Sequence, residues 1–166
     1  MARPILFSQV FPSYHPKAGK PTFFVEKIWK LLEEKHGSDF LGPMPEELVL
    51  HPHETSETLF AKSHTIRAGY RWKENEYFSP RVWSGPPYRS RQIVIAKDLL
   101  IRNIWTIQIL PTTEIFIQGQ PYGFYGSPDM EKLALHDGLT PEDFQAWFSR
   151  LPFEGQIICW DPDLQY

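Results

Sequence analysis

The sequence predicts an α+β fold, in which consecutive strands form a small, mainly antiparallel barrel or sandwich with flanking helices. Short apolar runs rich in β-branched and aromatic residues follow one another over residues 92–117, with short breaks between them. An amphipathic pattern of helical spacing precedes these runs, and two helix-start patterns follow them. Strands joined by short turns are typical of antiparallel sheets rather than of parallel sheets with crossover helices.

The first third of the chain is expected to hold one strand, one helix and a long loop. Residues 4–10 form a short apolar run that predicts a strand. Over residues 22–36 apolar side chains recur at helical spacing, and Gly37 is a typical helix stop. Residues 38–60 contain several prolines and glycines, so we expect an insertion or a long loop there, with room for a short helix after Pro45.

The clearest strand and helix signals lie in the second half of the chain. Ser127 and Thr140 are each followed by a proline and an acidic residue, which is the pattern of a capped helix start. We therefore expect a short helix after each of them. The glycine-rich residues 119–126 are interpreted as a turn whose two tyrosines could line a binding site. The expected strands are residues 92–96, 104–110, 114–117 and 156–160.

Length and composition fit a single domain over residues 1–166. The chain has 166 residues, and its apolar fraction of 42% is enough to form a core. Cys159 is the single cysteine, so the fold must hold without an internal disulfide, and a reducing cytoplasm is the expected location. The N-terminus lacks the pattern of a signal peptide, and no window reaches the roughly 20 apolar residues of a membrane helix. We expect a soluble, cytoplasmic protein without a membrane partner.

The charge of the chain is local rather than global. The formal net charge is -3, which gives no overall attraction to nucleic acid. Between Lys62 and Arg91, however, seven basic residues stand against two acidic ones, with tryptophans and tyrosines among them. A basic segment with interleaved aromatic residues is typical of a surface that contacts phosphates and stacks on bases.

Residues 62–67 read Lys-Ser-His-Thr-Ile-Arg and concentrate polar chemistry in a short stretch. If this stretch is extended, the period-two alternation of a strand places Ser63, Thr65 and Arg67 on one side. His64 then lies on the other side. Few folds need this combination of side chains for packing, so the stretch is the candidate centre of a functional site.

The same stretch resembles the signature of the ASCH domain, in which a small-residue turn leads into a Lys-Thr-x-Thr-Ile-Arg-like run. Residues 136–142 resemble the acid-containing, helix-opening segment of that class, and residues 81–90 resemble a subset of bacterial and bacteriophage ASCH proteins. The resemblance implies a small, mixed, mainly antiparallel β-barrel of the PUA-like class with flanking helices. It also implies a cleft suited to a nucleobase or nucleoside, and RNA-linked roles.

Some small members of the class are amidohydrolases that remove the acetyl group from N4-acetylcytidine. Their working Lys, Thr and acid map onto Lys62, Thr65 and Asp137 of this sequence. The chain departs from their pattern, since Ser63 stands where a threonine is usual and Asp137 stands where they carry a glutamate. Amide hydrolysis needs a base, a nucleophile or positioned water, and a proton donor for the leaving nitrogen. Lys62 could be the base if burial and Arg67 lower its pKa.

The sequence leaves three functions open for this protein. The first is a module that binds RNA or a modified nucleoside or nucleotide, the second is an amidohydrolase of N-acyl nucleosides, and the third is a protein-interaction domain with exposed aromatic residues. The residues expected to contact a nucleic acid or nucleoside are Ser63, His64, Arg67, Arg71, Trp72, Arg81, Trp83, Tyr88 and Arg89. No cofactor and no metal are expected, because the His-Pro-His-Glu run at residues 51–54 lacks further ligands at the spacing of a zinc site.

Each candidate residue also has an ordinary structural explanation. Lys62 and Arg67 could be solvated, or could pair with Asp137 at the surface. Thr65 is a residue that strands favour in any case, and Asp137 could be only a helix-end residue. Because a fold does not fix a function, the sequence leaves open whether the site binds or catalyses.

Overall fold

The computed structural model describes residues 2–51 and 59–166. They form an α+β fold with one mixed and one antiparallel sheet, which confirms the predicted fold class. The chain divides into two compact units: unit 1 comprises Met1–Ala61 and Tyr77–Leu100, and unit 2 comprises Lys62–Glu76 and Ile101–Tyr166. The single domain over the whole chain stays a prediction.

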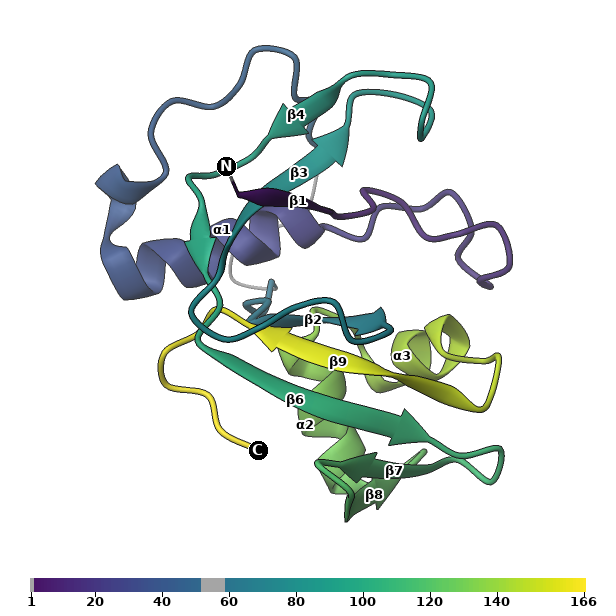
Figure 1. The fold of residues 1–166 in the computed structure, drawn as a ribbon. Coiled ribbons are helices and arrows are strands. Elements are labelled where there is room, and N and C mark those ends of the chain that lie inside the picture. Colours follow the sequence, from purple (N-terminus) through teal and green to yellow (C-terminus); the bar gives the residue numbers. More distant parts are fainter. Residues whose placement is uncertain (1, 52–58) are drawn as a thin grey trace. The chain divides into compact units, whose positions relative to one another are not determined.

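Unit 1 combines a mixed sheet with one long helix. Its elements are β1 (Arg3–Leu6), α1 (Phe24–His36), η1 (Ser38–Phe40), β3 (Tyr77–Trp83), β4 (Gln92–Val94) and β5 (Leu99–Leu100), as labelled in part in Figure 1. β3 pairs parallel with β1 and antiparallel with β4 and β5. Helix α1 follows the predicted periodicity, and its Trp29 side chain donates a hydrogen bond to the carbonyl of Ile95 (2.7 Å), next to β4.

Strand β3 was not among the predicted strands of unit 1. Pro80 stands in its middle, and a proline normally argues against an interior strand. Pro80 lies opposite Ile5 in the parallel pairing, and its carbonyl accepts a hydrogen bond from the Ile95 amide (3.0 Å). Residues 41–51, in the predicted long loop, form no helix or strand.

Unit 2 is an antiparallel sheet with two short helices on one face (Figure 1). Its elements are β2 (His64–Ala68), β6 (Asn103–Ile109), β7 (Glu114–Ile117), β8 (Gln120–Phe124), α2 (Pro128–His136), α3 (Pro141–Trp147) and β9 (Phe153–Cys159). The strand order is β2-β9-β6-β7-β8. Ser127 accepts a hydrogen bond from the Met130 amide and Thr140 accepts one from the Asp143 amide, each at 3.2 Å, which confirms both predicted helix caps.

The described strands do not close into a barrel, because they divide between two separate sheets. β8 also corrects an expectation, since residues 119–126 were predicted to be a turn and part of them pairs with β7. β8 is the edge strand of its sheet, where Pro121 removes no hydrogen bond that the sheet needs. Among the helices that the structure describes, none has the length and apolar character needed to span a membrane.

Candidate functional site

Strand β2 carries the candidate stretch into unit 2, where it pairs with β9 from His64 opposite Cys159 to Ala68 opposite Gly155. Just before the strand, the Ser63 amide donates to the carbonyl of His136 (2.8 Å), the last residue of α2. The Ser63 carbonyl accepts from the Trp160 amide (3.2 Å). These bonds fix Lys62 between the end of helix α2 and the end of strand β9.

Lys62 and Asp137 form a buried ion pair. The Lys62 Nζ atom lies 3.1 Å from Asp137 Oδ1, and it also donates to the Asp137 backbone carbonyl. Lys62 is 1% exposed and Asp137 is 4% exposed. Asp137 is the C-cap of α2, so the ammonium group also meets the negative end of the helix dipole. The structure therefore brings together two of the three predicted catalytic residues, and it does so in the interior rather than on the surface.

Gly138 makes room for the Lys62 side chain. The backbone of Gly138 has φ +83°, which L side chains rarely adopt, and its amide donates to the Leu135 carbonyl (3.0 Å) to end α2. A Cβ atom at this position would lie 3.2 Å from Lys62 Cδ and 3.3 Å from its Cβ and Cγ. The glycine thus serves both the helix end and the path of the lysine.

We expect Gly138→Ala to lower the free energy of unfolding by about 2 kcal/mol, because it adds both a disfavoured φ and a tight contact with Lys62. Gly119→Ala is the matched control, since Gly119 has φ +73° but no atom within 4 Å of an added Cβ. Urea unfolding of the two variants measures the contribution of the lysine contact as their difference. Equal losses in the two variants would show that the contact has no energetic role.

Burial sets the acidity of Lys62. It lowers the pKa of the ammonium from 10.5 to about 8; Asp137 opposes this shift and the nearby charge of Arg67 adds to it. The Lys62 amine is therefore deprotonated at a much lower pH than that of a solvated lysine. This is the property that a general base working near neutral pH requires.

The same shift predicts how stability depends on pH. Between about pH 8 and 10.5, the unfolded chain keeps the Lys62 proton that the folded chain has released. Because the unfolded state then binds more protons, this group makes the free energy of unfolding rise with pH across that window. We expect the rise between pH 7.5 and 9.5 in wild-type protein and its loss in Lys62→Met, measured by urea unfolding. Parallel pH profiles for the two proteins would contradict the shift.

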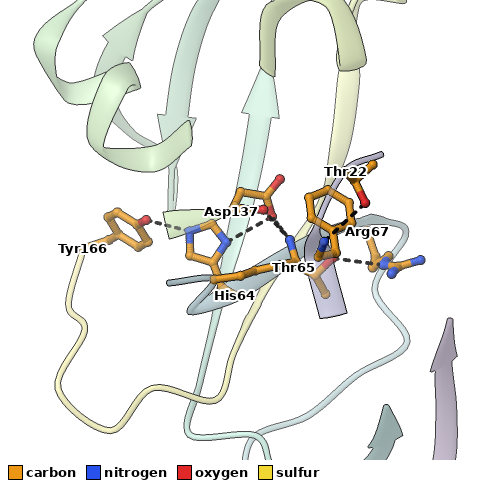
Figure 2. Close-up of polar contacts among 8 residues, drawn as sticks. Thr22, His64, Thr65, Arg67, Asp137 and Tyr166 are labelled. Atoms are coloured by element: carbon orange, nitrogen blue, oxygen red, sulfur yellow. Dashed lines mark hydrogen bonds and ion pairs between the residues drawn. The ribbon is translucent and has the colours of Figure 1, made fainter. Parts of the chain in front are cut away.

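His64 extends the buried pair toward the C-terminal residues. Its Nδ1 atom lies 3.4 Å from Asp137 Oδ1, too long for a good hydrogen bond, and it has no other partner among the described residues. Its Nε2 atom lies 2.7 Å from Tyr166 Oη (Figure 2). The same hydroxyl lies 3.0 Å from His136 Nδ1. Burial lowers the pKa of both histidines, so both are neutral at pH 7.

The simplest placement of protons in these polar contacts points the His64 Nδ1–H at Asp137. The Tyr166 hydroxyl then donates to His64 Nε2. The His136 Nδ1–H then donates to the same hydroxyl. Burial raises the pKa of Tyr166, which keeps its phenol protonated. A continuous polar chain thus connects Lys62 with His136 through Asp137, His64 and Tyr166.

Thr65 lies apart from this chain of contacts. Its hydroxyl accepts from the Arg67 Nε atom (3.3 Å), as the predicted alternation along the strand requires, and Figure 2 shows this pair. Burial lowers the pKa of Arg67 while the charge of Asp137 opposes the change, and the guanidinium stays charged. Ser63 is buried and donates to Asp161 Oδ2 (3.2 Å). Thr65 therefore does not complete the Lys62–Asp137 pair through a direct hydrogen bond.

Arg71 and Trp72 lie on the loop after β2. The amide of Trp72 donates to the Gln156 side chain (3.1 Å), and the Trp72 carbonyl accepts from it (2.9 Å), so the loop is held as if by one more step of a sheet. Arg71 and Tyr70 are exposed on this loop, and Trp72 is half-buried. Unit 2 thus presents a cation and an aromatic ring to solvent close to the candidate stretch.

The other predicted binding residues belong to unit 1. Arg81 lies in β3, where it donates to Ser79 (3.0 Å) and Gln92 (3.1 Å) and so braces the sheet. Trp83 ends the same strand, and its ring lies 5.2 Å from that of Tyr88, measured between centroids. Tyr88 is 89% exposed, and Arg89 beside it is also exposed. Trp83 thus lies at the end of β3, and Tyr88 and Arg89 lie on the loop that joins β3 to β4.

Metal and thiol chemistry find no support in the described residues. Within them, no three His, Cys, Asp or Glu side chains gather as ligands of a metal ion. Of the His-Pro-His-Glu run, residues 52–54 lie outside the described part of the chain. Burial raises the pKa of Cys159 to about 12, so its thiol is not a nucleophile at neutral pH.

Sequence reasoning did not identify Tyr166 or Asp161 as members of the site, and it quoted His136 only as part of a motif. His136 had a usable signal, because it immediately precedes Asp137 at the end of one helix. Tyr166 stands 102 residues from His64, and no local pattern indicates such a contact. Comparison with protein-family models, curated proteins and solved structures found no match to the chain.

Proposed function

We propose that this protein belongs to the ASCH class of PUA-like proteins and binds RNA or a modified nucleoside or nucleotide. The observation that carries the proposal is the ring pair of half-buried Trp83 and exposed Tyr88, next to an arginine on the loop between β3 and β4. Single-stranded nucleic acid is bound by aromatic rings that stack on bases and by cations that contact phosphates. This loop offers both within a few residues.

Three hydrogen bonds tie this loop together. The Ser90 hydroxyl accepts from the Gly85 amide (3.0 Å) and donates to the Pro86 carbonyl (2.8 Å), and the Ser84 amide donates to the Arg91 carbonyl (2.8 Å). Tyr88 has φ 64°, an uncommon value for a residue with a side chain. Strained positions gather at functional sites, where they hold a side chain ready for its partner. Backbone that is already held by hydrogen bonds loses less entropy when a base stacks on the side chain that it carries.

The two arginines of the loop differ in their surroundings. Arg91 forms an ion pair with Glu47 (2.9 Å), so its charge is already partly compensated. The Arg89 guanidinium has no hydrogen-bond or ion-pair partner in the described part of the chain. Arg89 is therefore the cation of this loop that a phosphate would meet first.

Binding of a fluorescent single-stranded RNA, followed by anisotropy at several salt concentrations, tests the proposal. We expect Tyr88→Ala and Arg89→Ala each to weaken binding by roughly tenfold, and Arg89→Ala to reduce the salt slope by about one. Arg102→Ala is the matched control, because Arg102 is an exposed arginine outside the basic segment. Wild-type protein that binds no RNA at low salt, or equal losses in all three variants, would refute the proposal.

The second candidate function is an amidohydrolase of N4-acetylcytidine or a related N-acyl nucleoside, and the buried Lys62–Asp137 pair favours it. The pKa of Lys62 near 8 gives a free amine close to neutral pH. In this mechanism the Lys62 amine takes a proton from a water molecule, and the resulting hydroxide attacks the acyl carbon. Arg67 stabilises the oxyanion, and the lysine returns its proton to the departing nitrogen as the C–N bond breaks. The products are cytidine and acetic acid, which releases its remaining proton to solvent as acetate.

Release of cytidine from N4-acetylcytidine, measured by chromatography against pH, tests this candidate. We expect activity to rise with pH through about 8, because Lys62 must lose its proton to act as a base. Lys62→Met should lower kcat/KM by at least about 100-fold. The control variant Arg91→Ala, on the loop between β3 and β4, should leave kcat/KM unchanged. No release of cytidine by wild-type protein, or full activity in Lys62→Met, would eliminate the hydrolase.

A further inference from the structure

The Tyr166 side chain occupies a site built from four other rings of unit 2. It stands edge-on to Trp105 of β6 and Tyr122 of β8, with centroid distances of 5.0 and 5.6 Å. It also stands edge-on to His64 (5.6 Å) and His136 (6.0 Å). Edge-to-face contacts of this kind are the favourable geometry for aromatic pairs. The four surrounding residues, here called the ring site, enclose one six-membered ring.

At one end of the ring site, two histidine nitrogens contact the Tyr166 hydroxyl. The Tyr166 hydroxyl lies 2.7 Å from His64 Nε2 and 3.0 Å from His136 Nδ1. With the proton assignment given above, the hydroxyl donates to His64 and accepts from His136. Any ring that replaces the phenol must therefore offer a donor and an acceptor side by side on one edge. Behind His64 lies the Lys62–Asp137 pair, so this end of the site is connected to the buried charges.

Residues 164–166 carry the Tyr166 ring without a backbone hydrogen bond of their own to any described residue. After Asp161, the Asp163 amide donates to the Asp161 side chain (2.9 Å). Within the described part of the chain, Leu164, Gln165 and Tyr166 make no backbone hydrogen bond, and Gln165 is exposed. The ring is thus anchored by its own contacts rather than by the backbone that carries it. An occupant held in this way can be displaced by a free ligand of the same shape.

We propose that the ring site binds a pyrimidine nucleoside in competition with Tyr166. A pyrimidine base has the single six-membered ring that the site encloses, and it has a donor and an acceptor next to each other: N4–H and N3 in cytosine, N3–H and O4 in uracil. The choice of a pyrimidine rests on the proposed nucleic-acid function, whereas the site itself rests on the contacts of Tyr166.

Titration calorimetry of the full chain with cytidine, uridine and p-cresol tests the proposal. We expect Tyr166→Ala to bind cytidine or uridine at least about tenfold more tightly than wild-type protein does, because the competing ring is removed. Adding His136→Ala to that variant should weaken the binding again, because a donor is lost. Tyr166→Ala that is folded by circular dichroism but binds neither nucleoside more tightly overturns the proposal. Binding of p-cresol alone also overturns it, because the site would then accept a phenol but no pyrimidine.

Tyr166→Phe decides the question if Tyr166→Ala does not fold, because it keeps the ring contacts and removes both hydrogen bonds. Its nucleoside affinity should lie between those of the wild type and the alanine variant, and an unchanged affinity overturns the proposal.

Arg89→Ala separates this proposal from the proposed function. We expect Arg89→Ala, combined with Tyr166→Ala, to lose RNA affinity but keep its nucleoside binding. Loss of both together would show that the ring site is not independent, which contradicts the proposal.

Discussion

Gly155→Ala is expected to lower the free energy of unfolding by about 3 kcal/mol or more, the largest effect of any single methyl group in unit 2. A Cβ atom at Gly155 would lie 2.0 Å from the backbone oxygen of Arg67 and 3.0 Å from Cα of Ala68. Both atoms belong to the β2 backbone, which is paired with β9 and cannot yield as a flexible side chain can. The substitution therefore pushes β2 away from β9 and disturbs the strand that leads from Lys62 and carries His64.

Urea unfolding measures this loss, and Gly85→Ala is the control. An added Cβ at Gly85 would meet its nearest atom, Ser90 Cβ, at an ordinary contact distance of 3.5 Å. We expect this control to change stability by less than about 0.5 kcal/mol. Similar stability of the two variants would mean that the pairing of β2 with β9 is looser than the structure has it.

Asp137→Ala is the second large effect, with an expected loss of about 3 to 5 kcal/mol. The substitution leaves the Lys62 ammonium buried at 1% exposure without its counter-charge. Part of the loss is relieved if the lysine gives up its proton, so the pKa of Lys62 should fall further below 8. Stability of the variant should consequently rise more steeply than that of the wild type as the pH increases toward 8.

A double-mutant cycle with Lys62→Met separates the pair from its surroundings. The double variant Lys62→Met, Asp137→Ala should be more stable than Asp137→Ala alone, because it contains no buried uncompensated charge. Urea unfolding at pH 7 gives the coupling energy directly. If the losses of the two single variants simply add, Lys62 and Asp137 do not interact, and the ion pair described here is wrong.

Local signals predicted the local structure. The caps at Ser127 and Thr140 and the periodicity of α1 depend on side chains within a few residues of each other, so the sequence pattern is sufficient. β3 was not predicted, and the parallel partner beside its Pro80 is distant in sequence, so no local pattern indicates it. The sheet assignments depend on pairings distant in sequence, which explains why one barrel was predicted where two sheets are found.

In the candidate site, too, local patterns predicted the contacts within one strand but not the contacts between distant residues. The common face of Thr65 and Arg67 follows from the alternation of a strand, and their hydrogen bond agrees with it. Lys62 and Asp137 lie 75 residues apart, and only a family resemblance suggested that they belong together. Nothing in the sequence indicated that the pair is buried, that His64 adjoins it, or that Tyr166 binds the far side of His64. These features arise from packing, which no local pattern encodes.

The proposed binding of RNA by the loop between β3 and β4 is tested most directly by photo-crosslinking. Single-stranded RNA that contains 4-thiouridine is irradiated with the wild-type protein, and the crosslinked peptides are identified by mass spectrometry. Stacking on the exposed Tyr88 ring beside Trp83 predicts that the main crosslink falls on a peptide that contains Tyr88, and that salt reduces its yield. Crosslinks confined to peptides outside residues 81–92, or none at all at low salt, would contradict it.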